Sequence, residues 1–157
     1  MIYLSLKSLH IVGAILFLGN ITTGIFWKAH ADRSRDPRII AHALDGILRS
    51  DRLFTIPGVI IILVAGFGAA IVAHLPLFRT AWVGAGIVLF TITGIIFMAR
   101  VAPLQRQMRD LARSSSDPAT FDWTRYEKLS RGWAMWGSIA LLAPVIAAAI
   151  MVFKPTW

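Results

Sequence analysis

The stretch Lys7–Trp27, KSLHIVGAILFLGNITTGIFW, has a lysine at its start and then twenty residues without another charged side chain. An α-helix of about 20 apolar residues is long enough to cross the hydrocarbon core of a bilayer. Three later segments have a similar length and contain no charged side chain at all. We therefore expect an all-α, polytopic membrane protein, a bundle of four transmembrane helices at residues 9–26, 54–73, 82–99 and 133–153.

Composition supports this class. Of the 157 residues, 57% are hydrophobic and 15% are charged, whereas a soluble domain usually carries about 25% charged residues. The first apolar stretch lacks a clustered basic region before it and a small-residue cleavage site after it, so we interpret it as a retained helix and not as a signal peptide. The chain has no cysteine, which excludes disulfides, thiolate metal sites and cysteine nucleophiles.

The net charge of +8 is unevenly distributed, because 13 of the 16 basic residues fall in the segments 28–53 and 100–132. The positive-inside rule then places both segments in the cytoplasm and both termini outside. Membrane topology and anionic lipid headgroups explain the basic excess better than nucleic acid does. No nucleic-acid partner is expected.

The connecting segments predict further structure within one membrane domain, residues 1–157. The short connection HLPLFRT predicts that spans two and three are antiparallel neighbours. In the segment 37–53, the apolar residues recur at helical spacing, with Asp36 as the N-cap and Pro37 as the first helical residue. The stripe of this amphipathic cytoplasmic extension consists of Ile40, Ala43, Leu44, Ile47 and Leu48.

The second basic segment shows a similar arrangement. Leu104, Met108 and Leu111 form an apolar stripe that continues span three as an amphipathic helix. Asp117 and Pro118 then predict the start of a new helix that leads into span four.

The polar side chains of span one fall on a single face. At 100° per residue, the members of this face project within about 80° of the direction of His10. A face that carries the charged and amide side chains of a span belongs inside the bundle and not against lipid. Its members are Lys7, His10, Gly13, Phe17, Asn20 and Gly24.

Two of the four histidines, His10 and His74, are expected toward the outer side of the membrane. A haem or a copper ion binds neutral imidazoles, and helical bundles supply such ligands from facing helices. His10 and His74 can form such a pair if spans one and two are neighbours. In the simpler interpretation His10 hydrogen-bonds a neighbouring helix and His74 lies at the interface. His30 and His42 lie among arginines and are expected in solvent.

Other polar groups admit two interpretations each. Lys7 can pair with a ligand propionate or extend to the outer headgroups, and Asn20 can support a cofactor or link two helices through hydrogen bonds. Asp51, with Arg52 and Arg100, predicts an interfacial ion-pair cluster or a site for an anionic group. No hydrolase, transferase or dinucleotide-binding motif is present.

The stretches YLSLKSLHIVGAILFLGNITTGIFWKAHADRSRDP and DRLFTIPGVIIILVAGFG resemble a family of predicted bacterial integral membrane proteins of unknown function. The pattern LKSLHIVGAILFLG is also similar to the first helix of HemJ-type protoporphyrinogen oxidases and of the copper-resistance D membrane domain. In the HemJ-type proteins the histidine that matches His10 is implicated in haem b binding. Those proteins also rely on a lysine in the third helix, and span three contains none, so the resemblance implies haem at His10 and not the oxidase activity.

Two functional hypotheses follow, and together they leave open whether the chain is an enzyme. In the first, the protein is a haem b-binding redox or electron-transfer protein with His10 and His74 as ligands, and copper as the alternative metal. In the second, it is a non-enzymatic subunit, in a homo-oligomer or with another membrane protein, whose basic helices bind a protein partner or anionic lipid. The residues of that surface are Arg33, Arg35, Arg38, Arg106 and Arg109.

Overall fold

The computed structural model describes residues 1–77, 79–115 and 117–154, and short connections join its helices. The elements in chain order are α1 (Ile2–Arg33), α2 (Pro37–Ser50), η1 (Asp51–Thr55), α3 (Ile56–Val72), α4 (Ala81–Ile96), η2 (Phe97–Val101), α5 (Ala102–Ser114) and α6 (Trp123–Phe153). Because α2, η1 and α3 are continuous, as are α4, η2 and α5, the chain forms four long helices. All four are long and apolar enough to cross a membrane, which confirms the predicted all-α class and the four spans.

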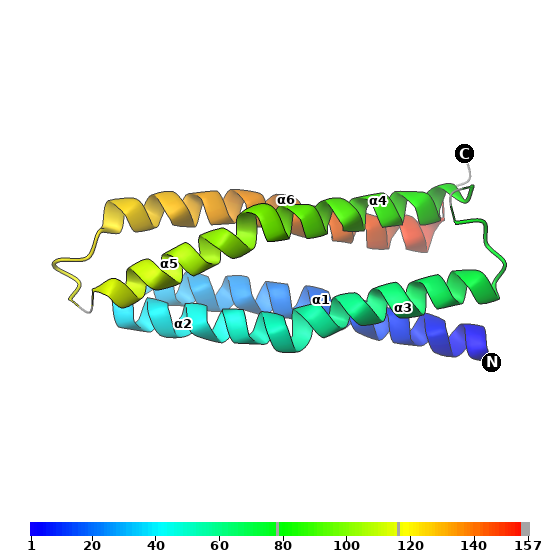
Figure 1. The fold of residues 1–157 in the computed structure, drawn as a ribbon, viewed down its shortest axis with the longest axis horizontal. Coiled ribbons are helices and arrows are strands. Elements are labelled where there is room, and N and C mark those ends of the chain that lie inside the picture. The colour runs from blue at the N-terminus through cyan, green and yellow to red at the C-terminus, as the bar shows by residue number, and fades with distance from the viewer. Residues whose placement is uncertain (78, 116, 155–157) are drawn as a thin grey trace.

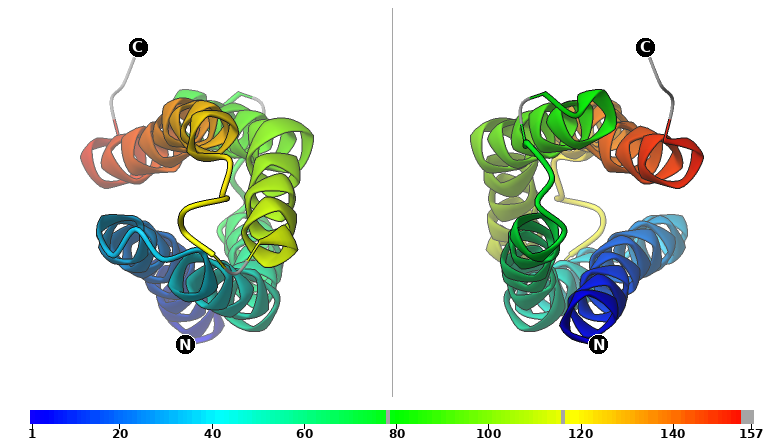
Figure 2. Two further views of the ribbon diagram at one scale, coloured as in Figure 1. Left: turned by 90° about the vertical axis from the view of Figure 1, so that its left-hand side faces the viewer. Right: turned by 90° about the vertical axis from the view of Figure 1, so that its right-hand side faces the viewer.

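The apolar parts of these helices are arranged as two antiparallel pairs, in which α1 packs along α3 and α4 packs along α6 (Figures 1 and 2). The predicted packing of spans two and three against each other is wrong, since α3 and α4 make no extensive contact over their described lengths. The connection between them is short, but it crosses from one pair to the other. The start of α1 and the end of α6 lie at the same end of the molecule (Figure 1).

The α1–α3 pair is tight because glycines face each other. A Cβ atom at Gly58 would lie 3.2 Å from the carbonyl oxygen of Gly13, so a larger residue there would force the helices apart. The buried side of α1 follows the face predicted from its polar residues, with Gly13 and Phe17 buried. The same face continues to Lys28 and Ala31, which are also buried.

At the opposite end, α2 and α5 pack against each other and close the bundle. The predicted amphipathic stripe of α2 is buried there at Ile40 and Leu44, each 1% exposed. On α5 the buried centre is Met108, as expected, but Gln105 and Ala112 are buried beside it, whereas Leu104 and Leu111 are only partly covered. The main hydrophobic core thus lies outside the most apolar part of the chain.

Each of the two continuous helices contains one π-helical turn, η1 or η2, that ends two residues before a proline. The N–H of Ile56 donates to the carbonyl of Asp51, five residues back, and the N–H of Ala102 donates likewise to Phe97. Pro57 and Pro103 follow, and a proline ring crowds the carbonyl four residues earlier. A wider turn accommodates this crowding and bends the helix. After η2, α5 leaves the direction of α4 and crosses to α2 (Figure 1).

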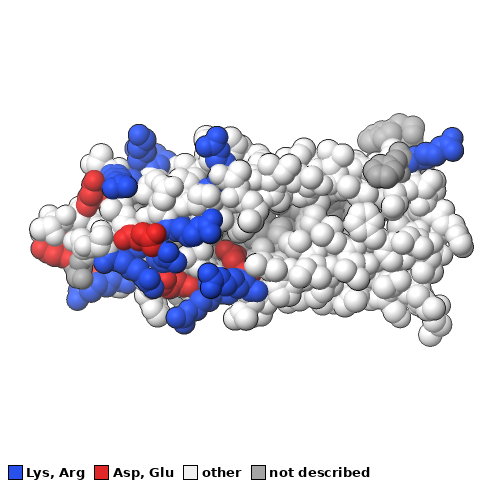
Figure 3. All heavy atoms as spheres, in the orientation of Figure 1, with Lys and Arg blue, Asp and Glu red and all other residues white. Residues whose placement is uncertain are grey.

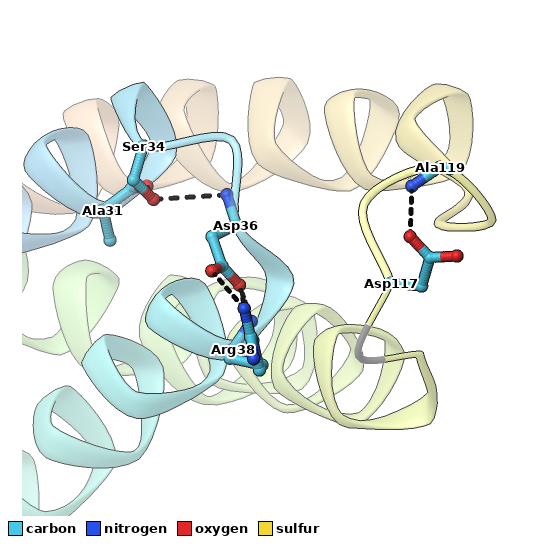
Figure 4. A network of polar contacts seen from close by, with 6 residues as sticks. All are labelled: Ala31, Ser34, Asp36, Arg38, Asp117 and Ala119. Atoms are coloured by element: carbon cyan, nitrogen blue, oxygen red, sulfur yellow. Dashed lines mark hydrogen bonds and ion pairs between the residues drawn. The ribbon is translucent and has the colours of Figure 1, made fainter.

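The helix starts were predicted correctly once and wrongly once (Figure 4). Asp36 accepts the backbone N–H of Arg38 at 2.8 Å and caps α2, with Pro37 as the first residue. The side chain of Arg38 also hydrogen-bonds this carboxylate and lowers the pKa of Asp36. Asp117 instead closes only a turn through the N–H of Ala119. The helix begins later, at Trp123, with Asp122 as its cap.

Charged side chains gather over one half of the molecule (Figure 3). We call this half, formed by α2, α5, the last turns of α1 and the first turns of α6, the basic end. The remainder, the apolar half, exposes large hydrophobic side chains to its surroundings, as a surface in contact with lipid must. These include Ile11, Ile15, Ile60, Val64, Val88, Ile92, Leu142 and Ile146.

The position of the core yields a stability prediction. Leu44→Ala removes a fully buried side chain at the basic end and should lower the free energy of unfolding by about 2–5 kcal/mol. Ile39→Ala on the same helix, where the side chain is 47% exposed, should change it by about 0.5 kcal/mol or less. Denaturant titration in detergent measures both. Equal losses would contradict a core centred on α2 and α5.

Candidate functional site

A pocket of about 320 Å³ lies where the two helix pairs diverge from the basic end. All four long helices contribute to its wall, and most of the lining side chains are apolar. The volume equals about ten times the ~30 Å³ share of one molecule in liquid water. The pocket is therefore large enough for a small organic molecule.

One end of the pocket is polar, and we call its four side chains the polar cluster: Asn20, Asp51, Thr55 and Gln105. Asn20 Nδ2 donates to Asp51 Oδ1 at 3.1 Å and to Thr55 Oγ1 at 2.8 Å. Thr55 Oγ1 donates to the same Asp51 oxygen at 2.9 Å. Asn20 therefore links α1 to η1, which is the helix-linking role weighed for it from the sequence.

Gln105 completes the cluster from α5. Its Nε2 lies 3.4 Å from Asp51 Oδ2, which makes this the longest hydrogen bond of the group. Its carbonyl oxygen, Oε1, is buried and has no hydrogen-bond partner, and Trp133 Nε1, on another side chain of the pocket wall, is in the same condition. Buried polar atoms without partners are rare, because each costs about 1–3 kcal/mol.

The aromatic rings of Phe17 and Phe90 meet on the apolar side of the pocket, with centroids 5.6 Å apart. Phe17 comes from α1 and Phe90 from α4, so this contact joins the two helix pairs inside the apolar half. Both rings line the pocket. They limit the apolar chamber on the side away from the polar cluster.

Behind the pocket, toward the basic end, Lys28 forms a buried network. Its Nζ lies 2.6 Å from Asp32 Oδ2, donates to Ser130 Oγ at 2.7 Å and stands 5.2 Å from the centre of the Trp133 ring. Tyr126 donates its hydroxyl to the other oxygen of Asp32. From the sequence, Lys28 contributed only to the count of basic residues that sets the membrane topology, although it continues the polar face of α1.

A second cavity, of about 290 Å³, opens beside this network between the end of α1 and the start of α6. Arg35 lies on its wall, where it pairs with Glu127 at 2.9 Å and stacks over Trp123 at 4.9 Å. The charged groups of this wall are thus largely engaged with one another. The two buried polar atoms without a described partner belong to residues that line the first pocket and not this cavity.

His10 lies in the α1–α3 contact, outside the lining of the pocket. Its Nδ1 is 2.8 Å from the carbonyl oxygen of Ile62, and a carbonyl can only accept, so Nδ1 carries the hydrogen and Nε2 holds the lone pair of the neutral ring. A Cβ atom at Gly66 would lie 2.8 Å from Nδ1, which explains why a glycine faces this ring.

The structure does not bring His74 to His10. His74 is exposed and follows α3 with a φ of 52°, as the left-handed residue of a helix-ending motif in which Leu75 N–H donates to Ala70. His10 is level with the middle of α3 near residue 64, so His74 lies about 15 Å farther along the axis at 1.5 Å per residue. Lys7 is exposed one turn before His10.

Two other predictions from the sequence can be compared with the structure. The ion-pair cluster predicted for Asp51, Arg52 and Arg100 is not among the described ion pairs, and Arg100 instead lies over the Trp136 ring. His30 and His42 are exposed on helices. Within residues 1–77, 79–115 and 117–154, no three His, Asp or Glu side chains converge as metal ligands do.

The sequence analysis therefore includes Asn20 and Asp51 but not Thr55, Gln105 or the convergence of all four side chains. Asp51 and Thr55 are four residues apart, a spacing that puts them on one helix face, and Gln105 interrupts an apolar stripe. These two signals were available. The convergence of α1, η1 and α5 on one point was not, because it depends on the two π-helical turns.

Comparison with known proteins places the chain in a family without assigning it an activity. No curated protein and no solved structure matches it. The family model described as "Predicted integral membrane protein (DUF2269)" matches residues 4–155. The match covers all four long helices and both sides of the pocket. The chain is thus a member of the DUF2269 family of predicted integral membrane proteins.

Proposed function

We propose that this protein is a membrane-embedded binding protein for a small amphipathic molecule, which it holds in the pocket between its two helix pairs. The observation that carries the proposal is the combination of an apolar chamber with a polar cluster at one end. Ligand pockets characteristically combine apolar walls with a few converging polar groups. The pocket lies between the two helix pairs and most of the side chains around it are apolar, so we propose that a ligand enters it from the bilayer.

For its setting we propose the inner membrane of a bacterium, with the basic end in the cytoplasm. The support is the concentration of Lys and Arg at that end (Figure 3). The polar cluster then faces the cytoplasmic headgroup region and the Phe17–Phe90 contact lies deeper in the bilayer. An amphipathic molecule would bind with its polar group toward the cytoplasm.

A second candidate function is haem b or copper binding in a redox role, and one observation supports it. The Ile62 carbonyl orients the His10 ring and leaves Nε2 as the ligand atom, the arrangement that metal-binding histidines usually have. A haem bound there supplies one-electron redox chemistry. We propose ligation by His10 alone, because His74 lies beyond the end of α3 and too far along the helix axis to act as the second ligand.

The basic surface proposed for a protein partner or anionic lipid has less support from the geometry. Three of its five arginines are paired within the chain: Arg35 with Glu127, Arg38 with Asp36 and Arg109 with Asp110. These pairs reduce the charge that the surface presents to a partner. We propose a lipid or oligomer contact at this surface only in addition to ligand binding in the pocket.

Filling the pocket tests the main proposal. Gly137 lines the pocket and no atom lies within 4 Å of a Cβ placed on it, so Gly137→Leu should occupy the chamber without disturbing the helices. Gly19 is equally open but exposed and outside the pocket, and Gly19→Leu is the matched control. We expect a co-purifying small molecule, identified by mass spectrometry, with the wild type and the control but not with Gly137→Leu. Equal occupancy in all three proteins would contradict the proposal.

The haem candidate has its own test. Reduced-minus-oxidised absorption spectra are recorded for the purified protein, for His10→Ala and for His74→Ala, each supplied with haem b during expression. Ligation by His10 alone predicts haem bands in the wild type and in His74→Ala, and their loss in His10→Ala. Featureless spectra from folded wild-type protein would exclude haem, and metal analysis of the same samples would decide on copper.

A further inference from the structure

The polar cluster leaves a negative charge without a positive partner, and we infer from it that the pocket selects amphipathic molecules with a cationic, N–H-bearing head group. A primary or secondary ammonium on an apolar chain is the simplest member of this class. The inference rests on the proposed function, since it specifies the ligand of the same pocket. It adds the sign of the ligand's charge, which the shape of the pocket alone does not give.

The first step concerns charge balance at Asp51. The groups that contact its carboxylate are neutral: the Asn20 amide, the Thr55 hydroxyl and the Gln105 amide. The described ion pairs do not include Asp51. A carboxylate withdrawn from water without a counter-charge is unfavourable, and such groups in membrane proteins commonly mark a ligand or ion site.

The basic residues on the helices around the pocket form no ion pair with Asp51 among the described residues. Lys28, which stands over the Trp133 ring, is paired with Asp32. Arg100 lies over Trp136, and Arg52 is exposed. No described side chain therefore neutralises Asp51, and the charge has to be balanced by a proton or by a bound cation.

The second step concerns the acceptor beside Asp51 that has no described partner, the side-chain oxygen Oε1 of Gln105. Gln105 is 3% exposed, and its Oε1 has no donor although its Nε2 reaches Asp51. Asp51 and Gln105 Oε1 are thus two acceptors close together, but Oε1 is covered and becomes available to a ligand when the Gln105 side chain turns toward the pocket. An ammonium group has several N–H donors and no acceptor, so it can hydrogen-bond both, whereas a carboxylate or phosphate head would be repelled by Asp51.

The third step concerns the remainder of the ligand. From the polar cluster the chamber extends between apolar side chains to the Phe17–Phe90 contact. Its volume of about 320 Å³ suits a chain of about ten carbon atoms, if each takes roughly the volume of one water molecule.

The test compares three probes of one chain length: decylamine, decanol and decanoate. Each is titrated against the protein in nanodiscs of neutral lipid, and the dissociation constant is obtained from the concentration dependence of Tm. The proteins are the wild type, Asp51→Asn, Gln105→Met and, as a control that neutralises a carboxylate outside the pocket, Asp110→Asn. Because all probes partition into the same bilayer, differences between proteins report on the pocket.

We expect the wild type and Asp110→Asn to bind decylamine about tenfold or more tightly than decanol, since hydrogen bonds between charged groups are the strong ones. Decanoate should bind most weakly. Asp51→Asn should abolish the preference and keep the affinity for decanol, and Gln105→Met should reduce the preference. If Asp51→Asn does not fold, Gln105→Met decides.

Equal affinities for decylamine and decanol in the wild type would overturn the inference, because a proton would then neutralise Asp51. A preference for the amine that survives in both pocket variants would overturn it as well. In either case the pocket would still bind an amphipathic molecule, and the proposed function would stand. If none of the three probes binds the wild type, the proposed function fails and the inference fails with it.

Discussion

The bends at η1 and η2 are the constraint on which the rest of the structure depends. Pro57 and Pro103 lie two residues after the ends of these wide turns, and beyond η2 the helix turns so that α5 can pack against α2. With straight helices, the α1–α3 and α4–α6 pairs could not be close at one end and separate at the other. The bends at η1 and η2 therefore produce both the core at the basic end and the pocket in the apolar half.

The same bends give the pocket its chemistry. Asp51 and Thr55 are the first and last residues of η1, whereas Val101, the last residue of η2, lies on the pocket wall four residues before Gln105. π-Helical turns recur at functional sites because they redirect side chains within an otherwise regular helix. Here they place a carboxylate, a hydroxyl and an amide against Asn20 of α1, at the boundary between the charged and the apolar parts of the chain.

The four spans, the cap at Asp36 and the polar face of α1 could be predicted, because apolar length, capping chemistry and helical periodicity are local properties of the sequence. The partner of each helix could not, since the packing of α1 on α3 depends on contacts such as Gly13 with Gly58. The sequence also drew attention to His10 by its residue type, and its contact with Ile62 matches the simpler interpretation without excluding a ligand role. Asn20 and Asp51 were recognised singly, but the polar cluster as a unit was not predicted, because its members come from segments that meet only after both bends form.

The central claim is that an amphipathic molecule occupies the chamber between the helix pairs, and photoaffinity mapping tests it most directly. A decyl chain with a terminal diazirine, carrying an ammonium head in one probe and a hydroxyl head in another, is cross-linked in nanodiscs and located by mass spectrometry. The account predicts adducts near the apolar limit of the pocket, at residues such as Phe17, Phe90 and Leu141, that disappear in Gly137→Leu. Adducts spread over the lipid-facing residues Ile15, Val64 and Ile146, with no change in that variant, would contradict it.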